Sequence, residues 1–489
     1  MGGRTSIAAG TTSPHGAAGA LLLTALLGMI QTPAPADLEV SESGHFFSYK
    51  GKTISLVGDS GTQCVMQNPN IDYQRWLDDC AEAGLNCVHI WSFVAPRQQL
   101  DGSDVEERYG YVYPGITPWP RKDNGPHAMD GGFQWDLQRF DEGEGPTHYW
   151  PRLRDLCRRA ERRDILAGIT VFWGWPKHPD DWAYHPFNVR NGGPVEDTPR
   201  PQASQVQMTH SPGQEVWKES WSNAWPPEKK TQWLWEQFAI KLLDETSSFR
   251  NVFFVFMDEH SYSEGNGGDH FLRFFQQRGA LWVDWERRRD MVDAVFEPVN
   301  FNDRTGKNGG VVVAFRREPA RPFMVLEGGP YQGEDVRLSI WSVLMGGGHH
   351  VFHDDAGMET VHTGIMGYDP NVPGSDTGAT RRAWMGHASR FFNGAIKHLD
   401  AMTPRNDLTG EDAFCLAAPG EEYVVYRTAQ GTGRVTLDLS DAPGTYRCRF
   451  YDPRTGQWRE PFTIEGGATQ RIAAPDAGDW VLHATATGG

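Results

Sequence analysis

Residues 251–257 read NVFFVFM, and they run directly into Asp258, Glu259 and His260. Apolar and polar residues do not alternate in this stretch, so both faces of the strand it predicts are apolar. Such strands belong to parallel sheets that are covered by helices on both sides. The stretch therefore predicts one strand of a parallel α/β fold, with carboxylates at its carboxyl end.

Strand-like and helix-like segments alternate on both sides of this stretch. Over about 350 residues this alternation favours a TIM-type (β/α)8 barrel, the commonest parallel α/β form of this size. The fifth and sixth strands are the least distinct, and we assign them to 281–283 and 311–315. The other predicted strands are 54–57, 87–91, 166–173, 323–326 and 350–352, and the predicted helices are 73–83, 150–163, 231–246, 335–345 and 380–393.

The two ends of the chain differ from this pattern. Residues 37–52 predict a short β-hairpin that precedes the barrel. From about residue 404, short strands of alternating polarity predict a small antiparallel β-sandwich. The predicted domains are thus a barrel over 37–403, with the hairpin at its start, and a sandwich over 404–489. The predicted sandwich strands are 422–427, 434–439, 446–451, 458–464 and 480–484.

The first 36 residues have the anatomy of a secretory signal peptide. Arg4 is the only charged residue before Asp37, residues 17–30 are uncharged and apolar, and small residues end the segment at Ala36. The apolar core is shorter than the roughly 20 residues of a membrane span. We therefore expect cleavage after Ala36 and a secreted or periplasmic protein, with an uncleaved anchor as the alternative.

The charge and cysteine content narrow the possible partners. The 489 residues include 46 Lys and Arg against 63 Asp and Glu, a formal net charge of −17. This balance disfavours nucleic acid and anionic membranes, which bind through Lys and Arg. Six cysteines without a CxxC pair disfavour a structural zinc site, and both one or two disulfides and isolated buried thiols remain open. No cofactor and no metal are expected, and the oligomeric state is open.

Two carboxylates stand at the ends of strongly apolar strands. Glu259 follows 251–257, and Glu327 ends FMVLE over 323–327. TIM-type barrels carry their active sites at the carboxyl ends of the strands. Hydrolysis of an acetal requires a proton for the departing oxygen and a carboxylate opposite it, which two such residues supply. The alternative is that each carboxylate pairs with an arginine or caps the next helix.

Aromatic and polar residues near predicted strand ends favour a sugar substrate, because indole rings pack against the C–H faces of sugars. The chain has 19 Trp, and the loop 182–188 (WAYHPFN) joins aromatic with hydrogen-bonding groups. Ordinary core packing, or a salt bridge in the case of Asp59, is the alternative. The candidate substrate-binding residues are Asp59, His89, Trp91, Trp173, Trp175, His185, Asn188, Asp258, Trp341, His353 and Asp354.

Several motifs of the chain form a recognisable series, namely GDSGTQ, AGLNCVHIW, HPFN, NVFFVFMDE, and LEGGP followed by SIWSVLMGGG. Together they resemble retaining glycoside hydrolases of clan A, and most of all the apiosidase-like group, whose barrel is followed by a small domain named for collagen binding. The C-terminal region resembles that small domain, whereas about 279–320 matches poorly.

The resemblance implies that Glu259 is the acid/base after the fourth strand and Glu327 the nucleophile after the seventh. Clan A enzymes usually have Asn before the acid/base, and Asp258 stands there in this chain. This departure leaves open whether Asp258 or Glu259 donates the proton.

The sequence thus predicts an exported retaining glycoside hydrolase that acts on a polysaccharide. Asp258 in place of Asn motivates one alternative, a non-catalytic carbohydrate-binding protein on a degenerate barrel. The run of His and Asp over 349–355 motivates another, a metal-dependent hydrolase, because imidazole and carboxylate groups are competent metal ligands.

Overall fold

The structure is a computed structural model of the chain. It describes residues 37–60, 65–93, 115–173, 183–194, 230–258, 272–273, 276–277, 280–297, 308–328, 334–352, 378–431 and 433–487. Among these residues, no helix has both the length and the apolar character that a membrane span requires. The predicted signal peptide, residues 1–36, lies outside the described part.

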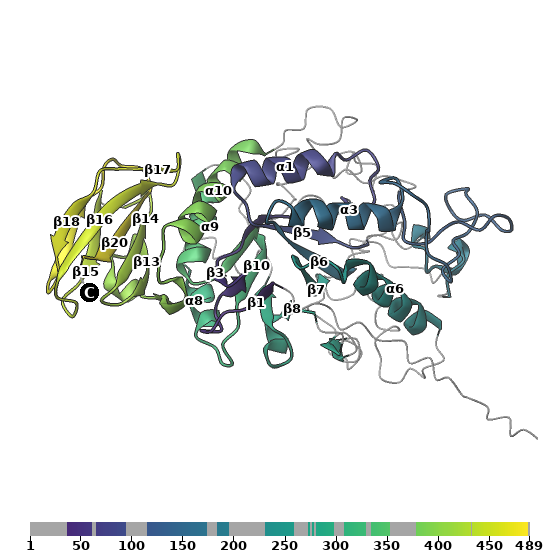
Figure 1. Cartoon of the computed structure of the whole chain (residues 1–489), viewed down its shortest axis with the longest axis horizontal. Coiled ribbons are helices and arrows are strands. Elements are labelled where there is room, and N and C mark those ends of the chain that lie inside the picture. Colours follow the sequence, from purple (N-terminus) through teal and green to yellow (C-terminus); the bar gives the residue numbers. More distant parts are fainter. Residues whose placement is uncertain are drawn as a thin grey trace, which may run out of the picture. The chain divides into compact units, whose positions relative to one another are not determined.

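Eight parallel strands close into a barrel, as the sequence predicts (Figure 1). Around the barrel they follow one another in chain order, and the last strand, β11, pairs with the first, β4. The eight strands are β4 (Val57–Asp59), β5 (Cys87–Trp91), β6 (Leu166–Trp173), β7 (Val252–Asp258), β8 (Trp282–Trp285), β9 (Ala294–Glu297), β10 (Phe323–Gly328) and β11 (His349–Phe352).

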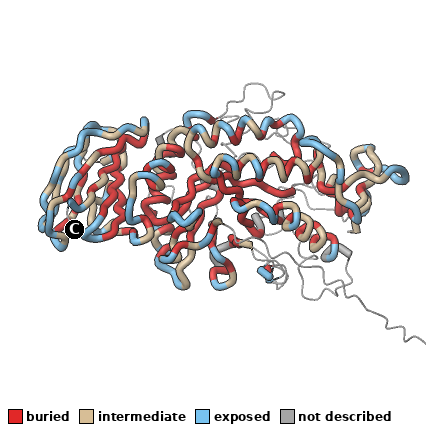
Figure 2. Tube along the Cα trace, viewed as in Figure 1, coloured by how far each residue is buried: buried red, intermediate tan, exposed pale blue. Residues whose placement is uncertain are grey.

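Alternate residues of these strands face the barrel interior and the surrounding helices. Val255, Leu326 and Val351 belong to a core that fills the interior, whereas their neighbours Phe254 and Val325 belong to the core beneath the helices. Both sides are buried, and Figure 2 shows the strands as a continuous buried centre. The unbroken apolar run of β7 follows from this double burial.

Six helices are described in the barrel region, and the first of them is capped at both ends. The first begins after Asp72, whose carboxylate accepts a hydrogen bond from the backbone N–H of Arg75, and ends at Gly84 in the left-handed conformation. The helices are α1 (Tyr73–Ala83), α3 (Tyr149–Glu161), α6 (Lys230–Thr246), α8 (Gly309–Phe315), α9 (Glu334–Met345) and α10 (Ala379–Gly394).

The prediction of a sixth strand at 311–315 is wrong, because this segment forms the helix α8 and the sixth strand is β9. Val311, Ala314 and Phe315 are buried at helical spacing, whereas Val313 is 53% exposed. The run of valines favours a strand by local propensity, but packing beneath one helical face decides the outcome. The fifth strand, β8, lies where it is predicted.

The amino-terminal segment forms three antiparallel strands rather than a simple hairpin. They are β1 (Leu38–Val40), β2 (Phe47–Tyr49) and β3 (Lys52–Ile54). Leu38, Phe47 and Ile54 pack with the interior core of the barrel. The predicted strand 54–57 is therefore divided, because Ile54 ends β3 while Val57 begins β4.

The C-terminal region forms two antiparallel sheets that share a core, in agreement with the predicted sandwich. The predicted strand 458–464 is divided into β17 and β18, and β13 was not predicted because AFCLAA is buried throughout and lacks alternation. One sheet contains β12 (Thr403–Pro404), β13 (Ala413–Ala418), β14 (Glu422–Arg427), β20 (Trp480–Ala486), β16 (Thr445–Asp452), β17 (Gln457–Trp458) and β18 (Phe462–Glu465), and the other contains β15 (Arg434–Asp438) and β19 (Thr469–Ala473).

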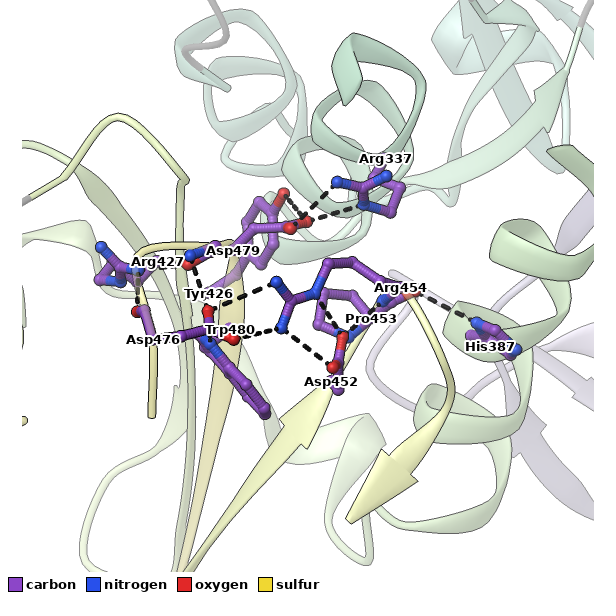
Figure 3. A network of polar contacts seen from close by, with 11 residues as sticks. Arg337, His387, Tyr426, Arg427, Asp452, Pro453, Arg454, Asp476, Asp479 and Trp480 are labelled. Atoms are coloured by element: carbon purple, nitrogen blue, oxygen red, sulfur yellow. Dashed lines mark hydrogen bonds and ion pairs between the residues drawn. The ribbon is translucent and has the colours of Figure 1, made fainter. Parts of the chain in front are cut away.

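The larger C-terminal sheet packs against barrel helices through aromatic and charged groups. Trp341 of α9 stacks on Tyr426 of β14, with ring centroids 5.5 Å apart. Arg337 of α9 forms a buried bidentate ion pair with Asp479, which also accepts a hydrogen bond from the Tyr426 hydroxyl (Figure 3). The ion pair buries two charges from positions 142 residues apart in the chain.

The cysteines of the described region are isolated thiols rather than disulfides. Five of them are buried and free, namely Cys80, Cys87, Cys157, Cys415 and Cys448. Of the two alternatives that the sequence leaves open, the structure shows isolated buried thiols for these five. Cys64 lies outside the described residues.

Candidate functional site

The carboxyl ends of β7 and β10 lie on opposite sides of the barrel, separated by β8 and β9. They are the fourth and seventh barrel strands. The backbone of Asp258 ends β7 in register with Trp173 of β6. Glu327 is the penultimate residue of β10, before Gly328. Glu259 lies outside the described residues, and so do the side chains of Asp258, Glu327 and Trp173.

A β-bulge interrupts β10 at this position. Val325 pairs with His350 and Gly328 with Phe352, so β10 has one more residue than β11 between the two pairs. Bulges occur often beside active sites, where they change the direction in which a strand-end residue points. The irregularity of β10 therefore coincides with the segment that carries the predicted nucleophile.

Polar and aromatic groups replace the apolar core toward the carboxyl end of the barrel. His89 and Trp91 lie on the same face of β5 as Cys87, which belongs to the interior core. The ring nitrogen Nε2 of His89 is 2.6 Å from the hydroxyl of Thr170 on β6, and the rings of His89 and Trp91 are 4.5 Å apart. His89, Trp91 and Thr170 are the polar and aromatic layer above the apolar interior.

Asp59 lies at the end of β4 but is committed to helix α10. Its carboxylate is fully buried and accepts a hydrogen bond from Arg382 at 2.9 Å, with Arg381 at 3.9 Å. The indole N–H of Trp76 lies 3.5 Å from the same carboxylate. The sequence left open whether Asp59 binds substrate or forms a salt bridge, and the described contacts are those of a salt bridge.

His185 and Asn188 shape their own loop. The ring nitrogen Nδ1 of His185 accepts a hydrogen bond from the backbone N–H of Phe187, and the side chain of Asn188 accepts one from the backbone N–H of Arg190. Both side chains are buried, and the His185 ring packs edge-on against Phe93. These contacts place the loop beside the carboxyl end of β5, because Phe93 lies two residues after that strand.

The assignment of Trp341 to the substrate site is wrong. Its side chain is fully buried between the helices and the C-terminal sheet, against Tyr426, Phe391 and Phe392. The helical position of Trp341, in the middle of α9, directs it away from the strand ends. Trp175, His353 and Asp354 lie outside the described residues.

His349 and His350 point to opposite sides of β11, so they do not belong to one ligand set. His349 accepts a hydrogen bond from the backbone N–H of Leu56 and lies beside the interior residue Phe47, whereas His350 lies 3.4 Å from the Ser339 hydroxyl of α9. Among the described residues, no group of three or more His, Cys, Asp or Glu side chains could hold a metal ion. His353, Asp354 and Asp355, the rest of that motif, lie outside the described part.

The two buried histidines predict a loss of stability in mild acid. Burial lowers the pKa of His350 to about 3, and it does the same for His349. Below pH 6.5, the ordinary histidine pKa, these two histidines bind protons in the unfolded chain but not in the folded chain. The free energy of unfolding therefore falls as the pH decreases from about 6.5 towards 3. We expect His350→Leu to reduce this loss by about 1.4 kcal/mol per pH unit.

Urea unfolding at pH 7, 6 and 5 measures this effect. The exposed His398 provides the control, because His398→Gln should leave the pH dependence of the wild-type chain unchanged. Equal pH dependence of the wild type and His350→Leu would contradict the expectation.

Two residues of this region were missed by the sequence reasoning. Thr170, which contacts His89, is the only hydroxyl residue in the run LAGITVFW of β6, and this isolated polar residue is a usable signal. Arg382, the partner of Asp59, lies in α10, 323 residues away. The sequence around Arg382 gives no indication of which carboxylate this arginine pairs with.

Comparisons with known proteins support the fold. No protein-family model matches the chain, and no curated protein sequence does. A glycoside hydrolase of family 5 from Bacteroides vulgatus superposes with a TM-score of 0.58 at 14% identity, covering 92% of this chain and 93% of its own. Another glycoside hydrolase superposes with a TM-score of 0.59 at 14% identity, covering 93% and 97%. The fold is thus that of glycoside hydrolases with a TIM-type barrel.

Proposed function

We propose that the chain is a retaining glycoside hydrolase that cleaves a glycosidic bond in a polysaccharide. The observation that carries this proposal is topological. Glu327 belongs to the seventh strand of a closed parallel barrel, and Glu259 directly follows the fourth. The carboxyl ends of such strands form the active-site face of TIM-type enzymes.

In the proposed first step, Glu327 attacks the anomeric carbon while Glu259 transfers its proton to the departing glycosidic oxygen. In the second step, Glu259 takes a proton from water, and the resulting hydroxide displaces Glu327 from the sugar. Each displacement inverts the anomeric carbon, so the product retains the configuration of the substrate. A retaining mechanism requires carboxyl groups about 5–5.5 Å apart, whereas an inverting one requires about 6.5–9.5 Å.

The polar layer of His89, Trp91 and Thr170 supports a sugar as the substrate. Aromatic rings beside hydrogen-bonding groups suit a ligand with apolar C–H faces and hydroxyl edges. We propose that Trp173, Trp175, Asp258, His353 and Asp354 complete the substrate contacts around this layer. Asp258 remains the second candidate for the proton donor.

We further propose that residues 1–36 direct export and that the mature chain begins at Asp37. An enzyme acting on a polysaccharide needs to be exported because polymers of that size do not enter the cell. The uncharged apolar segment 17–30 supports this assignment.

A glycan panel tests the proposed reaction. The purified chain is incubated with neutral and acidic polysaccharides, and proton NMR follows the first anomer that is released. We expect hydrolysis of at least one glycan, with the product first appearing in the anomeric configuration of the substrate. Release of the opposite anomer would refute the retaining mechanism. Binding without turnover on every glycan would instead favour the non-catalytic alternative.

A further inference from the structure

A pocket of about 490 Å³ lies between the end of helix α10 and the larger C-terminal sheet. From α10 and the segment after it come Arg390, Phe391 and Lys397, and from the sheet come Arg447 and Arg449 of β16, together with residues of β17 and β20. The pocket lies toward the amino ends of the barrel strands. Asn393, next to the lining residue Gly394, hydrogen-bonds Ser55, which precedes the first barrel strand, β4.

Strand alternation directs the cationic residues of the sheet into this pocket. Tyr446, Cys448 and Phe450 of β16 face the core of the C-terminal sheets, so Arg447 and Arg449 face the other side. Across the ladder to β20, Arg447 pairs with Thr485 and Arg449 with His483. One face of the sheet therefore presents two guanidinium groups side by side.

The positive charge of the pocket is not balanced by nearby carboxylates. Among the described residues, none of Arg390, Lys397, Arg447 and Arg449 forms an ion pair with an acidic side chain. Arg447 and Lys397 are exposed. Four cations without acidic partners are unusual in a chain whose formal net charge is −17, where carboxylates are abundant.

Glu422, a buried carboxylate that contacts the lining residue His483, already has its own hydrogen-bond donors. Glu422 accepts hydrogen bonds from His483 at 2.6 Å and from the backbone N–H groups of Lys397 and His398. Burial disfavours its ionisation, but these hydrogen bonds hold the pKa of Glu422 below its ordinary value. The negative charge of Glu422 is therefore stabilised by these hydrogen-bond donors rather than by the arginines of the pocket.

Arg449 is held in one orientation, with its charged end available. Its guanidinium group lies over the ring of Trp458, 4.7 Å from the centroid, and its Nε donates a hydrogen bond to the carbonyl of Arg459 at 3.3 Å. Trp458 is fixed in turn by stacking on Phe391. A guanidinium group anchored at Nε still presents its two terminal nitrogens, the geometry that binds a carboxylate in a bidentate manner.

We propose that this pocket is an accessory binding site for the carboxylate groups of an acidic polysaccharide. The site holds uronate units of the glycan at a distance from the catalytic face. Its volume suits a short stretch of saccharide, and its cations match a ligand with charge on successive units. The choice of a saccharide over other polyanions rests on the proposed function. The charge and geometry of the pocket do not depend on it.

Calorimetric titration of the full chain with hexagalacturonate tests the proposal. The double variant R447Q/R449Q removes the paired guanidinium groups, and K397Q/R447Q changes two exposed residues and so leaves packing intact. The matched control is R434Q/R471Q, which removes the same charge from exposed positions of β15 and β19. Fully methyl-esterified hexagalacturonate provides a neutral ligand of the same length, and a sulfated oligosaccharide of that length tests sulfate in place of carboxylate.

We expect hexagalacturonate to bind the wild type and the control alike, and each pocket variant at least about tenfold more weakly. The esterified and sulfated ligands should bind the wild type more weakly than hexagalacturonate. Pocket variants that bind like the wild type, equal binding of the esterified or sulfated ligand, or no binding to the wild type would overturn the proposal. Hydrolysis is not measured here, so failure of the glycan panel and failure of this titration are distinguishable.

Discussion

Replacement of Glu327 by glutamine is expected to lower kcat of hydrolysis on the order of 10⁴-fold or more, because an amide does not form the glycosyl–enzyme bond. Glutamine has the same shape as glutamate, so the variant keeps the packing around the strand end. If Glu327 acts only in the chemical step, binding of the substrate should change little while kcat falls. The measurement is initial-rate hydrolysis of a glycan that the wild type cleaves.

The control for this variant is Glu82→Gln. Glu82 is an exposed glutamate near the end of α1, and its side chain has no hydrogen bond or ion pair with the described residues. The Glu82→Gln variant should hydrolyse the glycan at the wild-type rate.

Added azide should restore turnover to Glu327→Ala by forming a glycosyl azide of inverted configuration, because azide enters the space left by the carboxylate. Wild-type activity in Glu327→Gln would refute the proposed nucleophile.

Breaking the ion pair between Arg337 and Asp479 is expected to cost about 3–5 kcal/mol of unfolding free energy, because the remaining charge stays buried without its partner. Arg337 Nε and Nη2 lie 3.0 Å and 3.1 Å from the two carboxylate oxygens of Asp479. The side chains are only 6% and 4% exposed. Urea unfolding of Arg337→Met measures the loss.

A double variant separates the charge from the packing. Arg337→Met with Asp479→Leu removes both charges, and we expect it to recover most of the stability lost by the single variant. The control is the exposed pair of Arg405 and Asp407, whose side chains are 33% and 57% exposed. Arg405→Met should cost at most about 1 kcal/mol. A loss at Arg337 no larger than that at Arg405 would contradict the argument.

The pattern of apolar residues predicted most barrel elements because each strand and helix is defined by local periodicity. The helix at α1 and the strand at β5 lie where the sequence places them. The sixth strand failed because the short β9 carries little signal, while the valines of α8 resemble a strand until one face is packed. The secondary-structure propensities of the residues do not indicate which face of a segment packs against the rest of the protein.

The sequence likewise predicted the strands that carry the candidate site but not the surroundings of its individual side chains. The strands that precede Glu259 and contain Glu327 were identified from apolar runs, and their order around the barrel agrees with the fourth and seventh positions that the resemblance implies. The surroundings of Asp59 and Trp341 were not predictable. Asp59 meets Arg382 from the last barrel helix, and Trp341 meets Tyr426 from the C-terminal sheet.

The amino-acid sequence alone determined the parallel barrel, the C-terminal β region and the carboxylates at two strand ends, because hydrophobic periodicity and strand-end position are local properties. Tertiary structure alone decided which charges are buried together and which faces remain open. Arg337 and Asp479 are 142 residues apart, and the cationic pocket joins α10 to β16. Such partners are brought together by the closing of the barrel and the packing of the sheet against it, and no spacing along the chain encodes that distance.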